Sequence, residues 1–237
     1  MSGLFITSTG TSIGKTYVTR LLLATDRQRH QKLTGSKPII SDWPSINEEI
    51  QHTDSGLILK ALGRSYTPEA INQISPWRYS APLTPSMAAI EEGKVIDVNA
   101  LITFSRNQIQ RAQSNNQIHV IEGAGGVMSP IWETFTNREW ILSLNCPCVL
   151  VVGSYLGTLS HTLTAIEALN QKNIPIMAVV FNEFNENSVF AEKTRETLAT
   201  LISPIPLILL ANMATHLDEL YCVTLETFSN KMCSIES

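Results

Sequence analysis

One eight-residue segment restricts the possible folds of this chain more than any other. It reads Thr9-Gly-Thr-Ser-Ile-Gly-Lys-Thr16 and directly follows the apolar run 4–8. Thr9 replaces the first glycine of the pattern G-x-x-x-x-G-K-[ST], and the remaining positions fit. Because loops with this pattern join a strand to a helix, we expect a strand over 4–8 and a helix over Lys15–Arg29.

The spacing within this segment suits a bound phosphate chain. Successive backbone N–H groups would point at phosphate oxygens, and the helix would add its positive N-terminus. Gly14 would permit close backbone approach, Lys15 would neutralise the β- and γ-phosphates, and the Thr16 hydroxyl would bind Mg²⁺. The alternative is a glycine turn with an ordinary surface lysine, but the position between a strand and a helix favours phosphate binding.

The rest of the chain predicts an α/β fold. Short apolar runs alternate with longer amphipathic segments, which is typical of repeated βαβ units. We therefore expect a single doubly wound, mostly parallel sheet with helices on both faces. Further strands are expected at 33–37, 118–121, 149–153 and 176–181, and further helices at 54–63, 83–92, 97–114 and from near Ser160. Residues 38–56 are typical of a functional loop, and no repeat or linker divides the expected single domain 1–237.

Composition and charge exclude several classes of function. With 43% apolar residues among 237, the chain has enough material for a packed core and is not disordered. Its net charge of −4 leaves no basic surplus for nucleic acid or an anionic membrane. No apolar run approaches the roughly 18–20 residues of a spanning helix, and no secretory signal is present, so we expect a cytoplasmic protein. Cys146 and Cys148 complete no zinc pattern and are expected to be small buried residues.

Several polar residues are expected beyond the carboxyl ends of strands, where doubly wound sheets bind their ligands. They are Lys37, Asp54, Glu122 and Asn182. Glu122 ends an apolar run and precedes three glycines, which favours Mg²⁺ binding over a merely capping or solvated carboxylate. Asp54 fits either a metal ligand or an ordinary helix N-cap.

Taken in order, these segments resemble the dethiobiotin synthetase family over most of the chain, up to about residue 185. The segments that carry the resemblance are Gly10-Thr-Ser-Ile-Gly-Lys-Thr16, Lys37-Pro-Ile-Ile-Ser41, Asp54, Ile121-Glu-Gly-Ala-Gly-Gly126, Pro130, Glu133-Thr-Phe-Thr136, Trp140, Leu156-Gly-Thr-Leu-Ser-His161 and Asn182. No single segment is specific, but the ordered set is. The resemblance implies a P-loop NTPase-like fold and one ATP-dependent ligase domain.

The resemblance also implies a reaction of biotin biosynthesis that uses ATP and Mg²⁺. The substrate would be 7,8-diaminononanoate, which forms a carbamate with CO₂. ATP would phosphorylate the carbamate to a carbamic-phosphoric anhydride, and the second amine would close the ring of dethiobiotin and release phosphate. Such chemistry depends on positioning and charge neutralisation more than on a protein nucleophile.

Residue roles follow from the same resemblance. Lys15 and Lys37 would be the catalytic residues, and Thr16, Asp54 and Glu122 would hold Mg²⁺. The ATP-binding residues would be Thr11, Ser12, Ile13, Gly14, Lys15, Thr16, Tyr17, Asp54, Glu122, Gly123, Ala124, Gly125 and Asn182. The substrate-binding residues would be Ser41, Gly125, Gly157 and Ser160. Since the family is homodimeric, residues 157–160 would serve the site across the subunit interface.

The chain departs from the family pattern at several positions. Ser8 replaces a glycine, Ser12 an acidic residue of some relatives, and Ser86 a histidine. Ser160 stands where an asparagine can bind the substrate carboxylate. Pro206-Leu-Ile-Leu-Leu-Ala211 lacks the Gly-x-Ile-Pro stretch that usually lines the nucleotide base, which bears on the choice between ATP and CTP.

Three other functions fit parts of the pattern. An amide-forming ligase of the same ATPase group usually carries a further glutamine-hydrolysing domain, for which 237 residues leave little room. An ATP-dependent switch protein places a signature lysine where this chain has Gly10. An inactive relative would explain the departures from the family pattern.

Overall fold

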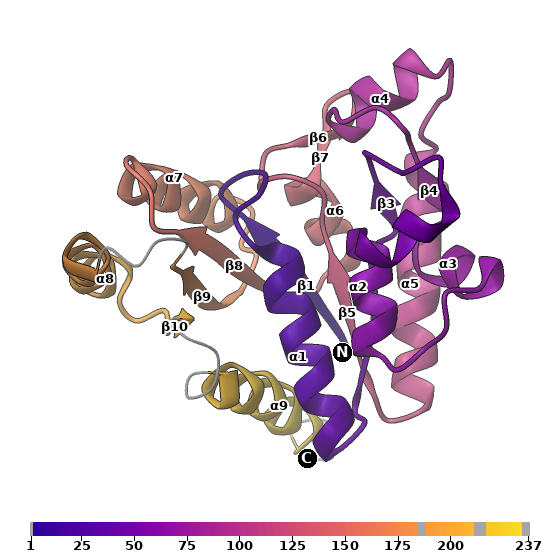
Figure 1. Ribbon diagram of the computed structural model, residues 1–237. Coiled ribbons are helices and arrows are strands. Elements are labelled where there is room, and N and C mark those ends of the chain that lie inside the picture. The colour runs from indigo at the N-terminus through magenta and orange to yellow at the C-terminus, as the bar shows by residue number, and fades with distance from the viewer. Residues whose placement is uncertain (1, 184–187, 211–216, 234–237) are drawn as a thin grey trace.

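The computed structural model describes residues 2–183, 188–210 and 217–233 and contains a six-stranded parallel sheet. The strands lie in the order β10-β9-β8-β1-β5-β2 (Figure 1). Their bounds are β1 Gly3–Ser8, β2 Leu33–Ser36, β5 Ile118–Glu122, β8 Cys148–Gly153, β9 Ile176–Asn182 and β10 Leu207–Leu210. Because all six strands run in parallel, their carboxyl ends share one edge, where ligands of such sheets bind.

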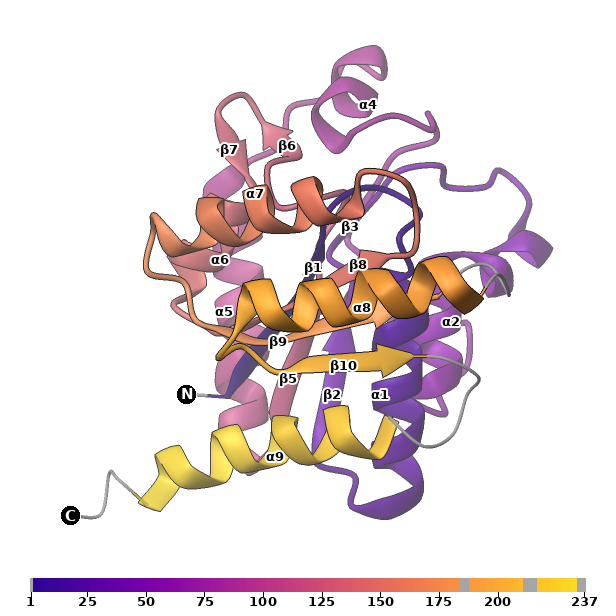
Figure 2. The same cartoon turned by 90° about the vertical axis from the view of Figure 1, so that its left-hand side faces the viewer.

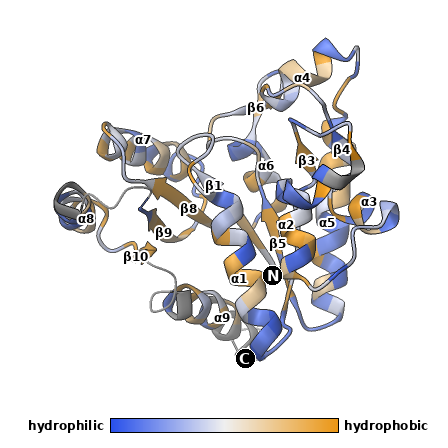
Figure 3. Cartoon of the chain, viewed as in Figure 1, coloured by the Kyte–Doolittle hydropathy of each residue, from blue (hydrophilic) through white to orange (hydrophobic). Residues whose placement is uncertain are grey.

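The central strands are apolar on both faces because helices cover both. Every residue of β1 is buried; Leu4 and Ile6 pack into one core cluster and Phe5 into the other. Successive side chains of a strand point to opposite faces, so a run without polar alternation requires a covered sheet. Figure 3 shows these central strands in the hydrophobic colour.

The helices form two layers around the sheet (Figures 1 and 2). On one face lie α1 (Lys15–Arg29), α2 (Asp54–Ala61), α3 (Pro68–Ile74) and α9 (Leu217–Cys233). On the other face lie α5 (Val98–Ser114), α6 (Asn137–Leu144), α7 (Thr158–Asn170) and α8 (Ser188–Ile202). The expected doubly wound α/β class with helices on both faces is confirmed.

Small elements build a wall beyond the carboxyl end of β1 (Figure 1). They are the parallel pair β3 (Ile39–Ile40) and β4 (Trp77–Arg78), the antiparallel pair β6 (Pro130–Trp132) and β7 (Phe135–Thr136), and helix α4 (Pro85–Glu91). The 3₁₀ helix η1 (Asn47–His52) leads into α2. Of these elements, β3, η1 and α4 supply residues to the outer side of the candidate site.

Some sequence-based boundaries need correction. The strand expected at 33–37 ends at Ser36, which leaves Lys37 just beyond the sheet, and the helix expected near Ser160 begins at Thr158. The segment 38–56, expected as an irregular loop, contains β3, η1 and the start of α2. Within this segment the backbone of β3 pairs with β4, which lies much later in the sequence. The segment therefore contains a strand that its local sequence does not indicate.

The structure can be compared with two expectations that were drawn from composition. No helix within the described ranges is long and apolar enough to cross a membrane. Cys146 and Cys148 are free and buried, as expected, and burial raises the pKa of the Cys146 thiol to about 12. A thiol with such a raised pKa is a poor nucleophile at neutral pH.

Candidate active site

The loop after β1 closes tightly before α1 begins. Gly14 is the N-cap of α1 and has φ 102°, a left-handed conformation that side chains with a Cβ rarely adopt. The glycine therefore lets the chain turn from the loop directly into the helix at Lys15. The first backbone N–H groups of α1 have no partners within the helix and suit a bound anion.

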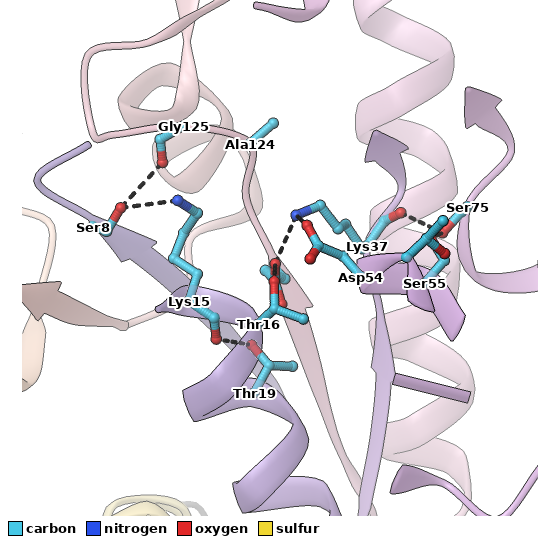
Figure 4. Close-up of polar contacts among 12 residues, drawn as sticks. Ser8, Lys15, Thr16, Thr19, Lys37, Asp54, Ser55, Ser75, Ala124 and Gly125 are labelled. Carbon is cyan, nitrogen blue, oxygen red and sulfur yellow. Dashed lines mark hydrogen bonds and ion pairs between the residues drawn. The ribbon is translucent and has the colours of Figure 1, made fainter. Parts of the chain in front are cut away.

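Lys15 is folded back into this loop (Figure 4). Its side chain is buried, and Nζ donates hydrogen bonds to Ser8 Oγ and to the Gly10 carbonyl oxygen, both at 3.0 Å. Burial, followed by repulsion from Lys37, lowers the pKa of Lys15 to about 8, although Glu122 acts in the opposite direction. The ammonium thus lies inside the phosphate loop with only uncharged oxygen partners.

A second cluster forms where β5 ends. The Glu122 side chain is fully buried, and its Oε1 accepts hydrogen bonds from Thr16 Oγ1 at 2.6 Å and from Lys37 Nζ at 2.7 Å. Its Oε2 has no hydrogen-bond partner within the described part of the chain. A buried carboxylate oxygen without a partner is costly, so this atom is suited to an incoming ligand.

Lys37 joins this cluster to α2. Its Nζ also donates to Asp54 Oδ2, so one ammonium contacts two carboxylates (Figure 4). Burial acts to lower the pKa of Lys37, but the charges of Glu122 and Asp54 raise it above the ordinary value. Burial acts to raise the pKa of Asp54, but Lys37 holds it below the ordinary value.

The structure excludes one of the two interpretations of Asp54, that of a helix N-cap. The N-cap of α2 is Thr53, whose Oγ1 accepts a hydrogen bond from the Gly56 N–H at 3.1 Å. Asp54 is therefore the first residue of the helix, and its side chain is directed at Lys37 instead of at the backbone. The carboxylate also lies at the positive end of the helix dipole.

The donor set of this cluster fits Mg²⁺. Thr16 contributes a hydroxyl, and Asp54 and Glu122 contribute carboxylates, which are the hard oxygen ligands that Mg²⁺ prefers. The buried, unpartnered Glu122 Oε2 adds an observation in favour of a cation at this place. The metal roles of these three residues stay predictions.

The glycine segment after β5 packs directly against the phosphate loop. Gly125 has φ +73°, and a Cβ there would collide with the Ser129 side chain. A Cβ at Gly126 would lie 3.0 Å from the Thr9 backbone. Asn137 is fully buried and fixes the backbone of this segment. Its Nδ2 donates to the carbonyl oxygens of Ala124 at 2.6 Å and Gly126 at 2.7 Å.

Two adjoining hollows lie beside the phosphate loop and the Lys37–Asp54 ion pair. The smaller, of about 300 Å³, lies at the phosphate loop and is lined by Thr11, Ser12, Gly14, Lys15, Thr16, Lys37, Asp54 and Gly125. The larger, of about 630 Å³, shares Thr11, Lys37, Asp54 and Gly125 and extends to Ser41, Thr84 and Ser129. Within the described residues the buried hydroxyls of Ser41 and Thr84 have no hydrogen-bond partner. The larger cavity therefore offers polar atoms for a ligand beside an apolar wall of Leu83, Pro85 and Met87.

Other expected site residues lie outside the linings of both hollows. Asn182, at the end of β9, donates from Nδ2 to the Ile13 carbonyl oxygen at 3.1 Å and so supports the phosphate loop. The Arg20 guanidinium lies over the Tyr17 ring, and its Cζ is 5.0 Å from the ring centroid. Gly123 packs against Phe5 and Asn137, and Ala211 lies outside the described residues.

Gly157 and Ser160 are exposed at the start of α7, away from both linings in this single chain. Their expected role requires a second subunit and is not tested by one chain. Conversely, the sequence interpretation missed Thr84, Ser129 and Asn137 as site residues. Thr84-Pro85 resembles an ordinary helix start, and nothing local marks Asn137 as the anchor of a loop that precedes it by eleven residues or more.

Known families and relatives match most of this chain. The family model described as "AAA domain" matches residues 2–213. An ATP-dependent dethiobiotin synthetase from Acidiphilium cryptum is 39% identical over 208 residues, which cover 87% of this chain and 91% of the relative. One from Phenylobacterium zucineum is 40% identical over 183 residues, which cover 77% of this chain and 76% of the relative.

Solved structures are similar in fold. A chain of the MinC:MinD cell division protein complex from Aquifex aeolicus matches with a TM-score of 0.54 at 12% identity, covering 94% of this chain and 86% of that one. At this identity the likeness supports the P-loop NTPase fold alone.

Proposed function

The chain belongs to the dethiobiotin synthetase family, and from that premise we propose how its residues carry out the ATP-dependent formation of dethiobiotin. Membership rests on relatives that are 39–40% identical over most of their length. The activity is that of an ATP-dependent ligase. The alternatives of a switch protein and of an amide-forming ligase are thereby set aside, because the relatives named here are dethiobiotin synthetases.

The proposed substrates are 7,8-diaminononanoate, CO₂ and ATP. One amine adds to CO₂ and loses a proton to give a carbamate. A carbamate oxygen then takes the γ-phosphoryl group of ATP, which releases ADP and leaves a carbamic-phosphoric anhydride. The second amine attacks the carbonyl carbon and loses a proton, the C–O bond to phosphate breaks, and the ureido ring closes with release of phosphate.

The phosphate loop binds the nucleotide in this proposal. The backbone of residues 11–14 and the N-terminus of α1 face the triphosphate, and Lys15 leaves Ser8 and Gly10 to pair with its terminal phosphates. A pKa of about 8 keeps Lys15 mostly protonated at neutral pH, so it brings a positive charge to the phosphates. Asn182 holds the loop through Ile13.

The larger cavity holds the diamine and its carbamate. Lys37 lines both hollows, so its ammonium lies between the nucleotide site and the substrate site and suits the carbamate oxygens and the transferred phosphoryl group. The unpartnered hydroxyl of Ser41 and the backbone at Gly125 are proposed as further substrate contacts. The two hollows adjoin, which would place acceptor and donor groups in one site.

Thr16, Asp54 and Glu122 are proposed to hold Mg²⁺. When bound there, the ion supplies charge neutralisation for the phosphate oxygens and fixes their orientation. The chain's own part is to present three oxygen ligands from α1, α2 and β5 at one point.

The assembly and its setting complete the proposal. We infer one ligase domain over 1–237 and a homodimer in which residues 157–160 of one subunit reach the substrate of the other. A cytoplasmic location follows from the dependence on ATP. No nucleic acid or membrane partner is needed for this chemistry.

The observation that carries the proposal is the convergence of Thr16, Lys37, Asp54 and Glu122 beside the phosphate loop. The test is mass-spectrometric detection of dethiobiotin from purified protein with 7,8-diaminononanoate, bicarbonate, Mg²⁺ and ATP. Each component is omitted in turn, and CTP replaces ATP in a parallel reaction. Product that requires every component supports the proposal, whereas nucleotide binding without product contradicts it and favours a switch protein or a relative with a different amine substrate.

A further inference from the structure

The strongest unexplained feature of the site is the position of the Lys37 ammonium. It lies against Asp54 and Glu122, two of the three residues proposed to hold Mg²⁺. The third, Thr16, donates to the same Glu122 oxygen that Lys37 contacts. Lys37 therefore occupies the point at which the expected metal ligands meet.

The Lys37 ammonium compensates the negative charge of these two carboxylates. The Lys37 and Glu122 side chains are 7% and 0% exposed, so neither charge is well solvated. A buried carboxylate such as that of Glu122 is strongly disfavoured without a cation. Among the described residues Lys37 is the only cation that forms an ion pair with Glu122 or with the more exposed Asp54. A divalent ion and an ammonium at the same oxygens would repel each other, so the two cations exclude one another.

The side chain of Lys37 has somewhere else to go. Lys37 lines both the phosphate hollow and the substrate cavity, and its four-carbon stem is flexible. Its backbone, in contrast, is fastened: the Lys37 carbonyl oxygen accepts a hydrogen bond from Ser75 Oγ at 2.7 Å, and Ser75 is bonded to Ser55 at 2.6 Å (Figure 4). A change of partner thus requires a new rotamer of the side chain without movement of the strand end.

We propose that Lys37 is the built-in counter-ion of the metal site: it holds Asp54 and Glu122 while no divalent cation is bound, and it turns toward the substrate cavity when a divalent cation takes those carboxylates. This inference rests on the proposed function, since it assumes the same metal ligands. It adds an order of events. The Lys37 ammonium reaches the carbamate only after a divalent cation is in place, so substrate activation is coupled to a loaded metal site.

The test measures Mn²⁺ binding to the nucleotide-free protein by electron paramagnetic resonance, which needs no catalytic activity. In Lys37→Gln the competing ammonium is gone, and we expect Mn²⁺ to bind at least about tenfold more tightly than in the unmutated protein. The matched control is Lys15→Gln, which removes an equal charge from the same site but breaks no contact with Asp54 or Glu122. Equal effects of the two substitutions, or no effect of Lys37→Gln, would overturn the proposal.

A second measurement uses the unmutated protein and stands even if Lys37→Gln fails to fold. The ammonium signal of Lys37 is followed in ¹H–¹⁵N spectra during a titration with Mg²⁺ alone. We expect the signal to shift or vanish with the same midpoint as metal binding, because Lys37 gives up its two carboxylate partners. A signal that stays unchanged at saturating Mg²⁺ contradicts the exchange. Failure to form dethiobiotin would leave both results untouched, so the two proposals are tested separately.

Discussion

Lys15 is the residue on which nucleotide chemistry most directly depends. It is buried in the phosphate loop without a carboxylate partner, so removing it sacrifices no ion pair of the fold. We predict that Lys15→Ala lowers ATP turnover at least about a hundredfold, because the terminal phosphates lose their cation. The melting temperature should stay close to that of the unmutated protein. ADP release and thermal unfolding are the measurements.

The control for this prediction is Lys172→Ala, at an exposed lysine of the α7–β9 turn. Its turnover should match that of the unmutated protein. Retained turnover in Lys15→Ala would mean that the phosphate loop does not serve the reaction.

His119 gives the fold a defined response to acid. Its ring nitrogens lie 2.8 Å from Thr34 Oγ1 and from Ser36 Oγ, and burial lowers the pKa of His119 to about 3. Below about pH 6.5 the His119 imidazole is therefore protonated in the unfolded chain but stays neutral in the folded chain. As a result, the free energy of unfolding falls as the pH falls from 6.5 toward 3. The stability that depends on a neutral His119 is fully present above pH 6.5, and about 2 kcal/mol of the free energy of unfolding is lost by pH 5.

Urea unfolding at about pH 7.5 and about pH 5 tests this response. His119→Gln removes the titrating ring, so the difference in unfolding free energy between the two pH values should shrink by about 2 kcal/mol. An unchanged difference in the variant would show that other groups cause the loss of stability in acid.

Single residues differ in how far the sequence reveals them. Lys15 and Glu122 can be recognised from the residues around them. Lys15 follows a glycine and begins a helix, and Glu122 lies between an apolar run and glycines. Asn137 is not marked, because its importance comes from two carbonyl groups that only the folded chain brings to it. Ser8 shows the same limit, since the sequence records a departure from the family but not a bond to Lys15.

At the scale of elements, prediction worked where local chemistry decides the structure. The helix Lys15–Arg29 begins as expected because Gly14 turns the chain immediately before it. The strands β1, β5, β8 and β9 lie within one residue of their expected bounds, since long apolar runs buried on both faces have few alternatives. β3 and β4 were missed because each has two residues and exists only by pairing with the other, far along the chain.

The glycine segment and α6 form one unit through Asn137. We predict that Asn137→Ala lowers the free energy of unfolding by about 2–3 kcal/mol, because two buried carbonyl groups lose their donor. The rate of dethiobiotin formation should fall as well, since the segment forms a wall of both hollows. Urea unfolding and steady-state kinetics measure the two effects.

The matched control is Asn115→Ala, at an exposed asparagine whose amide bonds the last turn of α5. Its effect on the free energy of unfolding should stay within about 0.5 kcal/mol. Similar losses in both variants would argue against a special role of Asn137.

At the scale of the whole molecule, the parallel sheet explains why the site is assembled from distant segments. β5 lies between β1 and β2, so residues that end or follow these three strands come together although they are separated by up to about one hundred positions. The sequence predicts this convergence from topology alone. It does not predict which groups pair, because the Lys37 contacts depend on side-chain geometry and charge in the closed site.

The proposed homodimer makes Leu156 the most informative surface residue. It is 99% exposed on the loop before α7, beside the residues expected to cross the subunit interface. Burying a leucine stabilises by about 1.5–3 kcal/mol, and a two-fold interface buries it twice. Leu156→Asp should therefore raise the dimer dissociation constant at least about a hundredfold. Sedimentation at several protein concentrations measures the change, and Leu201→Asp, at a half-exposed leucine of α8, should leave it unaltered. A Leu156→Asp protein that stays dimeric to the same dilution as the unmutated protein would locate the interface on another face.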